Sequence, residues 1–171
     1  VIDEAEPRGD FRRARACSFE SQNSQVSPVT GDSQFNGGSM ENTIKVLLAD
    51  DHEVFRRSLA EFLNVRESIE VVAQASNGND AVDQASQYEP DLVLLDLNMP
   101  GRNGFEASKA IKHRRPQTRV YIVSANEGDL YRSMAMLNKA DGYIPKSTLK
   151  RDILALLDGL LAGQMATSNA A

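Results

Sequence analysis

The chain has 171 residues, of which 41% are hydrophobic and 25% charged, so it can bury the core of an ordinary globular domain. The net charge of −5 argues against a nucleic-acid-binding surface on this chain, and no apolar run approaches the roughly 18 residues of a membrane span. The single cysteine, Cys17, excludes an internal disulfide, which fits the reducing cytoplasm. We therefore expect a cytoplasmic protein without membrane contact.

Residues 1–40 differ in composition from the rest of the chain. They are rich in Ser, Gly, Gln and Asn and show no sustained period of helix or strand. We expect a disordered tail, a tag or a linker here, because the segment cannot bury enough apolar area to order itself. A Gly-Gly-Ser sequence precedes Met40, which we interpret as the natural start; a genuine disordered tail is the alternative.

Strands and helices alternate from Ile44 onward. Short, almost continuously apolar runs predict buried parallel strands at 44–49, 69–75, 92–95, 119–123 and 142–145. The segments that follow them predict helices at about 53–64, 79–88, 104–113, 127–138 and 148–161. Five such units in series predict an α/β fold, with a parallel sheet covered by helices on both faces.

Two details of the helices can be predicted from side chains. One face of the helix at 53–64 collects apolar residues, namely Val54, Phe55, Leu59, Phe62 and Leu63. Asn79 follows the strand-breaking Asn77-Gly78 pair, and we expect its side chain to cap the helix that runs to Tyr88.

Polar residues directly follow four of the five predicted strands. Asp50 and Asp51 follow the first strand, Asp96 the third, Ser124 the fourth and Lys146 the fifth. Open α/β sheets bind ligands just beyond the carboxyl ends of their strands. We therefore expect three carboxylates, a hydroxyl and an ammonium group to converge at one edge of the sheet.

This set of groups suits Mg2+ and a phosphoryl group. Asp51 and Asp96 can supply carboxylate ligands, Asp50 can hold a metal-bound water, and the backbone carbonyl of Asn98 can add another oxygen. Three adjacent carboxylates are costly unless a cation neutralises them, which is the physical argument for the metal. Asp96 is the predicted nucleophile that accepts the phosphoryl group, and Lys146 and Ser124 are placed to contact its oxygens.

Each of these residues also has a plainer interpretation. The Asp50-Asp51 pair could cap a helix, Lys146 could be a surface charge and Ser124 a loop hydroxyl. The two histidines, His52 and His113, show no metal-ligand spacing and receive no role. Taken together, the residues after four strands favour the phosphoryl site over these separate interpretations.

The combined motifs resemble the CheY-like receiver domain of two-component response regulators. The matching segments are Leu-Leu-Ala-Asp-Asp-His at 47–52, Asp-Leu-Val-Leu-Leu-Asp-Leu-Asn-Met-Pro-Gly at 91–101, Ile-Val-Ser-Ala at 122–125 and Ala-Asp-Gly-Tyr-Ile-Pro-Lys at 140–146. The resemblance covers about 42–162 and leaves 163–171 as a flexible C-terminal tail. The residues of these motifs are most similar to those of receivers linked to a LuxR-type helix-turn-helix output domain.

This resemblance implies a flavodoxin-like fold with strand order 2-1-3-4-5. It implies that Asp96 accepts phosphate from the phosphohistidine of a sensor kinase or phosphotransfer protein, with Mg2+ held by Asp50 and Asp51. It further implies that Ser124 is the switch hydroxyl and that Tyr143 is the switch aromatic, which turns inward when Ser124 moves toward the phosphoryl group. The surface of the fourth helix, fifth strand and fifth helix would then change. Such a domain catalyses only its own phosphorylation and dephosphorylation.

The sequence departs from the family pattern at the end of the fourth helix. Relatives often place Gly at position 139, so we expect Asn138 or Lys139 to adopt the left-handed conformation of the cap.

Several alternatives for the function remain open. The chain could be a docking module that takes no phosphate, although the acidic residues and Lys146 are all present. An aspartate-dependent phosphatase would need a second Asp where Asn98 stands, and no Gly-x-Gly-x-x-Gly supports nucleotide binding. The outer helices could support a homodimer, and DNA binding is expected only if an output domain follows in a longer protein.

Overall fold

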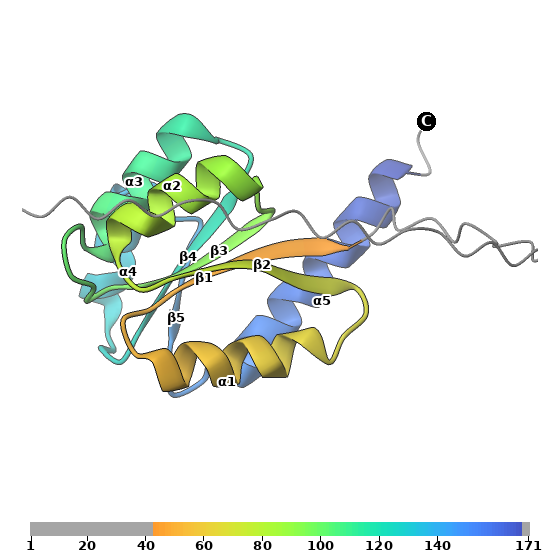
Figure 1. Ribbon diagram of the computed structural model, residues 1–171, viewed down its shortest axis with the longest axis horizontal. Helices are drawn as coiled ribbons and strands as arrows, with labels where there is room; N and C mark the ends of the chain where they lie inside the picture. The colour runs from red at the N-terminus through yellow and green to blue at the C-terminus, as the bar shows by residue number, and fades with distance from the viewer. Residues whose placement is uncertain (1–42, 169–171) are drawn as a thin grey trace, which may run out of the picture. The chain divides into compact units, whose positions relative to one another are not determined.

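A five-stranded parallel sheet forms the centre of the computed structural model, which describes residues 43–168 (Figure 1). The strands are β1 Ile44–Ala49, β2 Ile69–Ala75, β3 Leu92–Asp96, β4 Arg119–Ser124 and β5 Gly142–Pro145. They lie in the order β2-β1-β3-β4-β5, and every neighbouring pair is parallel. The predicted α/β class and strand order are confirmed, whereas the expectations for residues 1–40 lie outside the described residues.

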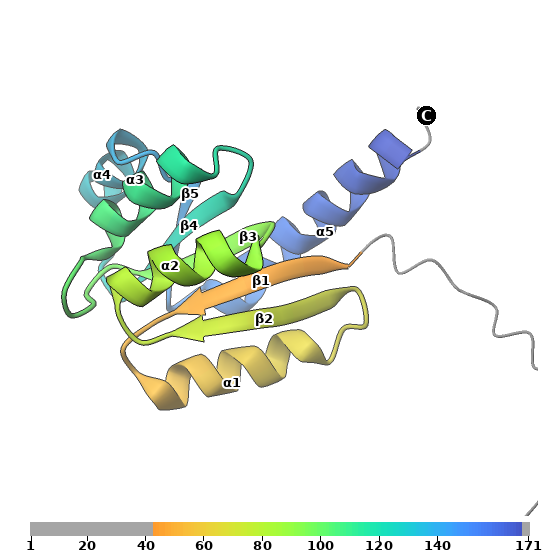
Figure 2. The same cartoon turned by 45° about the horizontal axis from the view of Figure 1, so that its top comes forward.

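Five helices cover the two faces of this sheet. They are α1 Glu53–Asn64, α2 Gly78–Tyr88, α3 Gly104–Arg114, α4 Asp129–Leu137 and α5 Leu149–Ser168. Helices α1 and α5 pack on one face, and α2, α3 and α4 lie on the other (Figures 1 and 2). None of the helices in residues 43–168 is both long enough and apolar enough to cross a membrane.

Strands β1 and β3 are almost continuously apolar because both of their faces are buried. Leu47 and Leu95 point into the cluster formed with α2, α3 and α4. Their neighbours Leu48 and Leu94 point into the cluster formed with α1 and α5. Alternate residues of one strand thus enter different cores, which explains why these strands lack the polar alternation of a half-exposed sheet.

Helix α1 corrects one of the predicted apolar positions. Leu59 and Leu63 are buried, and Phe55 and Phe62 are half-buried at the edge of the same face. Val54 is 81% exposed and lies outside this face, so its predicted place in the core was wrong. The apolar face therefore begins at Phe55.

Two helix starts also differ from the sequence-based expectation. Asn77, and not Asn79, caps α2, because its side chain accepts a hydrogen bond from the backbone N–H of Asp80 at 2.9 Å. Helix α4 begins at Asp129 instead of 127, since Gly128 has a φ of 123° that helical residues do not adopt.

The C-terminal ends of α4 and α5 can also be compared with the sequence-based prediction. Lys139 has a φ of 68° directly after α4, as expected for one of the two residues proposed for the left-handed cap. Helix α5 continues to Ser168 instead of ending near residue 161, so residues 163–168 of the predicted tail are helical. Gly163 does not stop the helix.

Candidate functional site: an acidic pocket at the carboxyl edge of the sheet

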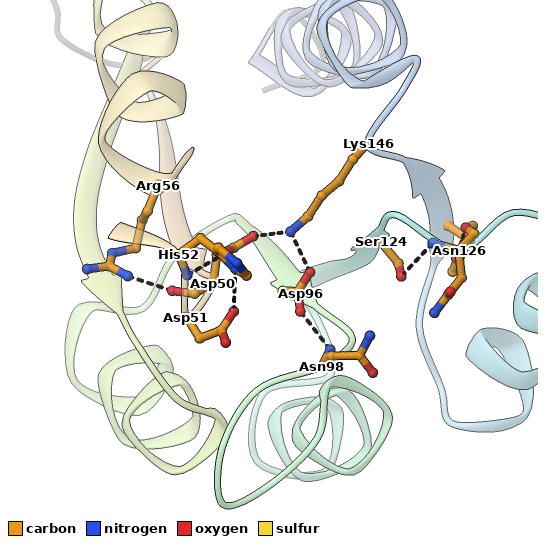
Figure 3. A network of polar contacts seen from close by, with 10 residues as sticks. Asp50, Asp51, His52, Arg56, Asp96, Asn98, Ser124, Asn126 and Lys146 are labelled. Atoms are coloured by element: carbon orange, nitrogen blue, oxygen red, sulfur yellow. Dashed lines mark hydrogen bonds and ion pairs between the residues drawn. The ribbon is translucent and has the colours of Figure 1, made fainter. Parts of the chain in front are cut away.

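The loop after β1 places Asp50 and Asp51 at the carboxyl edge of the sheet (Figure 3). Asp50 is 4% exposed, and its Oδ1 accepts a hydrogen bond from the backbone N–H of His52 at 2.9 Å. The residue at the cap position of α1 is His52, which makes no capping bond through its side chain. Neither aspartate therefore serves as the helix cap that was the plainer interpretation of this pair.

Lys146 joins the ends of β1, β3 and β5. Its Nζ lies 2.7 Å from Oδ2 of Asp50 and 2.7 Å from Oδ1 of Asp96, as Figure 3 shows. Both carboxylates are buried, and Lys146 is largely enclosed between them. The structure therefore brings together these three sequence-predicted residues from distant parts of the chain.

The charge of Lys146 is maintained in this enclosed position. Burial lowers the pKa of Lys146, but hydrogen bonds and charge attraction from Asp50 and Asp96 outweigh it and raise the pKa above its ordinary value. Its ammonium group also lies 4.5 Å from the ring centroid of Phe55 on α1, within the range of a cation–π contact. Lys146 thus stays cationic beside the two carboxylates at neutral pH.

The second oxygen of Asp96 faces the loop that leads to α3. Its Oδ2 accepts a hydrogen bond from the backbone N–H of Asn98 at 2.6 Å. The same loop passes close to Gly104, where an added Cβ would lie 2.3 Å from the carbonyl oxygen of Asp96. A capping box between Asn103 and Glu106 sets the start of α3 next to this glycine. Close packing against α3 therefore holds the backbone of Asp96.

Ser124 and Tyr143 are connected through one peptide segment. The hydroxyl of Ser124 accepts a hydrogen bond from the backbone N–H of Asn126 at 3.2 Å, and the hydroxyl of Tyr143 donates to the carbonyl of Asn126 at 2.6 Å. Ser124 is buried, and Tyr143 is only 7% exposed with its ring stacked on Tyr131. The ring that we expected to turn inward on activation is therefore already buried here.

Three oxygen-bearing acidic groups are available for a divalent cation. The ligand atoms of Asp50, Asp51 and His52 all lie within 4.8 Å of one another, and Asp96 faces the same space in Figure 3. Three carboxylates against one ammonium group leave local negative charge, so the donor set fits a hard cation such as Mg2+. The side chain of Asn98 is exposed, which is compatible with a ligand role for its backbone only.

Sequence reasoning missed three residues of this site. The Nδ1 of His52 lies 2.9 Å from Oδ1 of Asp51, and Nη1 of Arg56 donates to the backbone carbonyl of Asp50 at 2.5 Å. Asn126 contributes only its backbone. Arg56 lies one turn into α1, and this spacing from Asp50 could have indicated a contact between them. The contacts of Asn126 are made by its backbone, so its residue type gives no indication of them.

Comparisons with known proteins agree with this geometry. The family model described as "Response regulator receiver domain" matches residues 46–158. The nitrate/nitrite response regulator NarL of Escherichia coli K12 is 34% identical over 132 residues, which are 77% of this chain and 61% of NarL. The chain thus spans less than two thirds of this relative.

Two solved structures extend the comparison. The response regulator domain of Thermotoga maritima CheB is 32% identical with a TM-score of 0.63, over 71% of this chain and 96% of that one. A LuxR-family response regulator from Aurantimonas is 27% identical with a TM-score of 0.63, over 75% and 99% of the two chains. With the matched motifs and the acidic pocket, these findings establish that the chain belongs to the response regulator receiver domain family.

Proposed function

We propose that this domain is a phosphorylation-dependent signalling switch that accepts a phosphoryl group on Asp96. The observation that carries the proposal is the pairing of Lys146 with both Asp50 and Asp96 in one buried pocket. A carboxylate oxygen of Asp96 attacks the phosphorus of a phosphohistidine, a P–O bond forms as the P–N bond breaks, and the donor imidazole keeps the electron pair of that bond. The donor is a sensor histidine kinase or a phosphotransfer protein.

The residues around Asp96 have separate roles in this proposal. Asp50, Asp51, Asp96 and the carbonyl of Asn98 would hold Mg2+, which neutralises charge on the transferring group when bound. Lys146 exchanges its contact with the Asp96 carboxylate for one with a phosphoryl oxygen. The backbone N–H of Asn98 already donates to Asp96 and keeps the carboxylate oriented.

The same pocket explains how phosphorylation could reach a distant surface. The hydroxyl of Ser124 leaves the backbone N–H of Asn126 and donates to the phosphoryl group. Asn126 also anchors the hydroxyl of Tyr143, so movement of this peptide loosens the buried ring of this β5 residue, which stacks on Tyr131 of α4. The populations of two arrangements of the α4–β5–α5 surface then change, without any inward swing of Tyr143.

A docking module without phosphorylation is the less favoured alternative. Such a module has no need for a partly enclosed lysine between two buried carboxylates, an arrangement that is costly in folding free energy. An aspartate-dependent phosphatase is disfavoured because Asn98 offers an amide where that chemistry needs an acid.

A small phosphodonor with Mg2+ tests the proposal directly. We expect intact mass measurement to show the gain of one phosphoryl group in the unaltered protein and none in Asp96→Asn. The matched control is Asp83→Asn, which alters an exposed carboxylate on α2 and should leave labelling unchanged. Failure of the unaltered protein to gain mass would leave the docking module as the better account.

A further inference from the structure

A pocket of about 520 Å3 opens between α1 and the first turn of α5, beside the acidic pocket. Phe55, Leu59 and Phe62 line it from α1, and Leu149 lines it from α5. Its volume falls within the range of about 300–1,000 Å3 that is typical of small-molecule sites. Apart from Lys146, its lining residues have no part in the proposed phosphoryl chemistry.

The rim of this pocket carries positive charge only. Lys146, Lys150 and Arg151 line it together with the hydroxyl-bearing Ser58, Ser147 and Thr148, and no acidic residue is among the lining residues. Lys150 is exposed, and its Nζ lies 5.7 Å from the ring centroid of Phe62. Among residues 43–163 no carboxylate lies within ion-pair distance of Lys150, whereas Arg151 is paired with Asp152.

We infer that this pocket binds a small apolar monocarboxylic acid. An alkyl or aromatic body would cover the partly exposed rings of Phe55 and Phe62, with the buried Leu59 at the base of the pocket. The carboxylate would pair with Lys150 at the rim and accept a hydrogen bond from the hydroxyl of Ser58. Charge complementarity with a rim of one sign selects the anion over a neutral apolar ligand.

The pocket shares one wall with the acidic site. Lys146 lines the pocket while it bridges Asp50 and Asp96, and the ring of Phe55 lies against its ammonium group. A ligand body packed on the Phe55 ring would therefore disturb the position of the Lys146 ammonium group between Asp50 and Asp96. This regulatory consequence rests on the proposed function, whereas binding itself does not.

The test is an NMR titration of the 15N-labelled protein with octanoate, with the neutral octanamide as the matched probe. We expect octanoate to shift backbone amides of residues 55–62 and 146–151. We expect octanamide to bind about tenfold more weakly, since it lacks the charge-assisted bond. Equal binding of the two probes, or no shifts in these segments, would overturn the inference.

Two variants and a control locate the site. Lys150→Glu should weaken octanoate binding at least about tenfold and leave octanamide binding unchanged, because it reverses the rim charge alone. Lys109→Glu makes the same charge change at an exposed position of α3 and should not alter the binding of either probe. Ser58→Trp, at an exposed position, should fill the pocket and reduce the binding of both probes.

Three further results would contradict the inference. Unchanged octanoate affinity in Lys150→Glu is the first, and equal losses in Lys109→Glu are the second. The third is sedimentation equilibrium showing a dimer of the free protein that Ser58→Trp dissociates, which would place a second copy of the chain on this face. All of these measurements use unphosphorylated protein, so they remain valid even if Asp96 fails to accept phosphate.

Discussion

Lys146 bridges the two buried carboxylates of the acidic pocket. It pairs with Asp50 and Asp96 and lies over the ring of Phe55. Removing its charge would leave two buried carboxylates beside each other without a cation. A change at this residue therefore tests the stability of the fold and the chemistry of the site at once.

We predict that Lys146→Met lowers the free energy of unfolding by about 2 kcal/mol without Mg2+, below the usual cost of breaking a fully buried pair because Lys146 is partly exposed. It should also greatly reduce labelling by a small phosphodonor. Urea unfolding and intact mass measure the two effects. Lys109→Met, at an exposed position of α3, is the control, and an equal loss of stability in that variant would contradict the prediction.

The raised pKa of Lys146 gives this prediction a pH dependence. A pKa raised by folding means that the ammonium contributes its full stabilisation below the pKa of unfolded lysine, about 10.4. That contribution disappears as the pH rises through the higher pKa of the folded protein. The unaltered protein should therefore lose stability above about pH 10.4 more steeply than Lys146→Met. Parallel stability curves would argue against the pairing.

Tyr143→Phe separates phosphorylation from the conformational response. The variant keeps the buried ring but loses the hydrogen bond to the carbonyl of Asn126. We expect labelling of Asp96 at the normal level and smaller phosphorylation-induced amide shifts in α4, β5 and α5. NMR spectra before and after labelling measure this response. Shifts of full size would show that the tyrosine hydroxyl has no part in the switch.

At the scale of elements, the end of α4 contains a strained residue. Lys139 has a φ of 68°, which glycine adopts at no steric cost and lysine does not. We predict that Lys139→Gly raises the free energy of unfolding by about 0.5–1 kcal/mol, after allowance for the greater flexibility of glycine in the unfolded chain. Chemical denaturation measures the gain. Lys139→Ala retains the strain, so a similar gain in that variant would refute the explanation.

The elements show which local features can be predicted from sequence. All five strands were predicted within one residue of their ends, because each contains a short run of mostly apolar residues, although exposed residues such as Glu70 and Gln74 interrupt β2. Helix ends were less accurate. Both Asn77 and Asn79 have side chains able to cap α2, and only the backbone geometry makes Asn77 the cap. Neither Gly159 nor Gly163 interrupts α5, since isolated glycines are tolerated within a helix.

At the scale of the whole molecule, the site could be predicted because parallel topology brings the ends of β1, β3, β4 and β5 to one edge. Asp50, Asp96 and Lys146 meet there as expected. The parts that could not be predicted depend on loop geometry. These are the link through Asn126 and the position of His52 on Asp51.

The negative charge of the assembled pocket predicts stabilisation by Mg2+. A ligand that binds only the folded state at about 100 times its dissociation constant adds about 2.7 kcal/mol to the stability. We expect Mg2+ to raise the melting temperature of the unaltered protein and to have little effect on Asp51→Asn. In Asp83→Asn, the exposed control on α2, the rise should persist. An equal rise in all three proteins would indicate a non-specific salt effect.

The central claim is that the phosphoryl group is carried by Asp96 itself. Borohydride reduction of the labelled protein followed by peptide sequencing tests this most directly, because an acyl phosphate on aspartate is reduced to homoserine. The account predicts homoserine at position 96 and unchanged residues at positions 50, 51 and 124. An intact aspartate at position 96, with the phosphoryl group on His52 or Ser124, would contradict it.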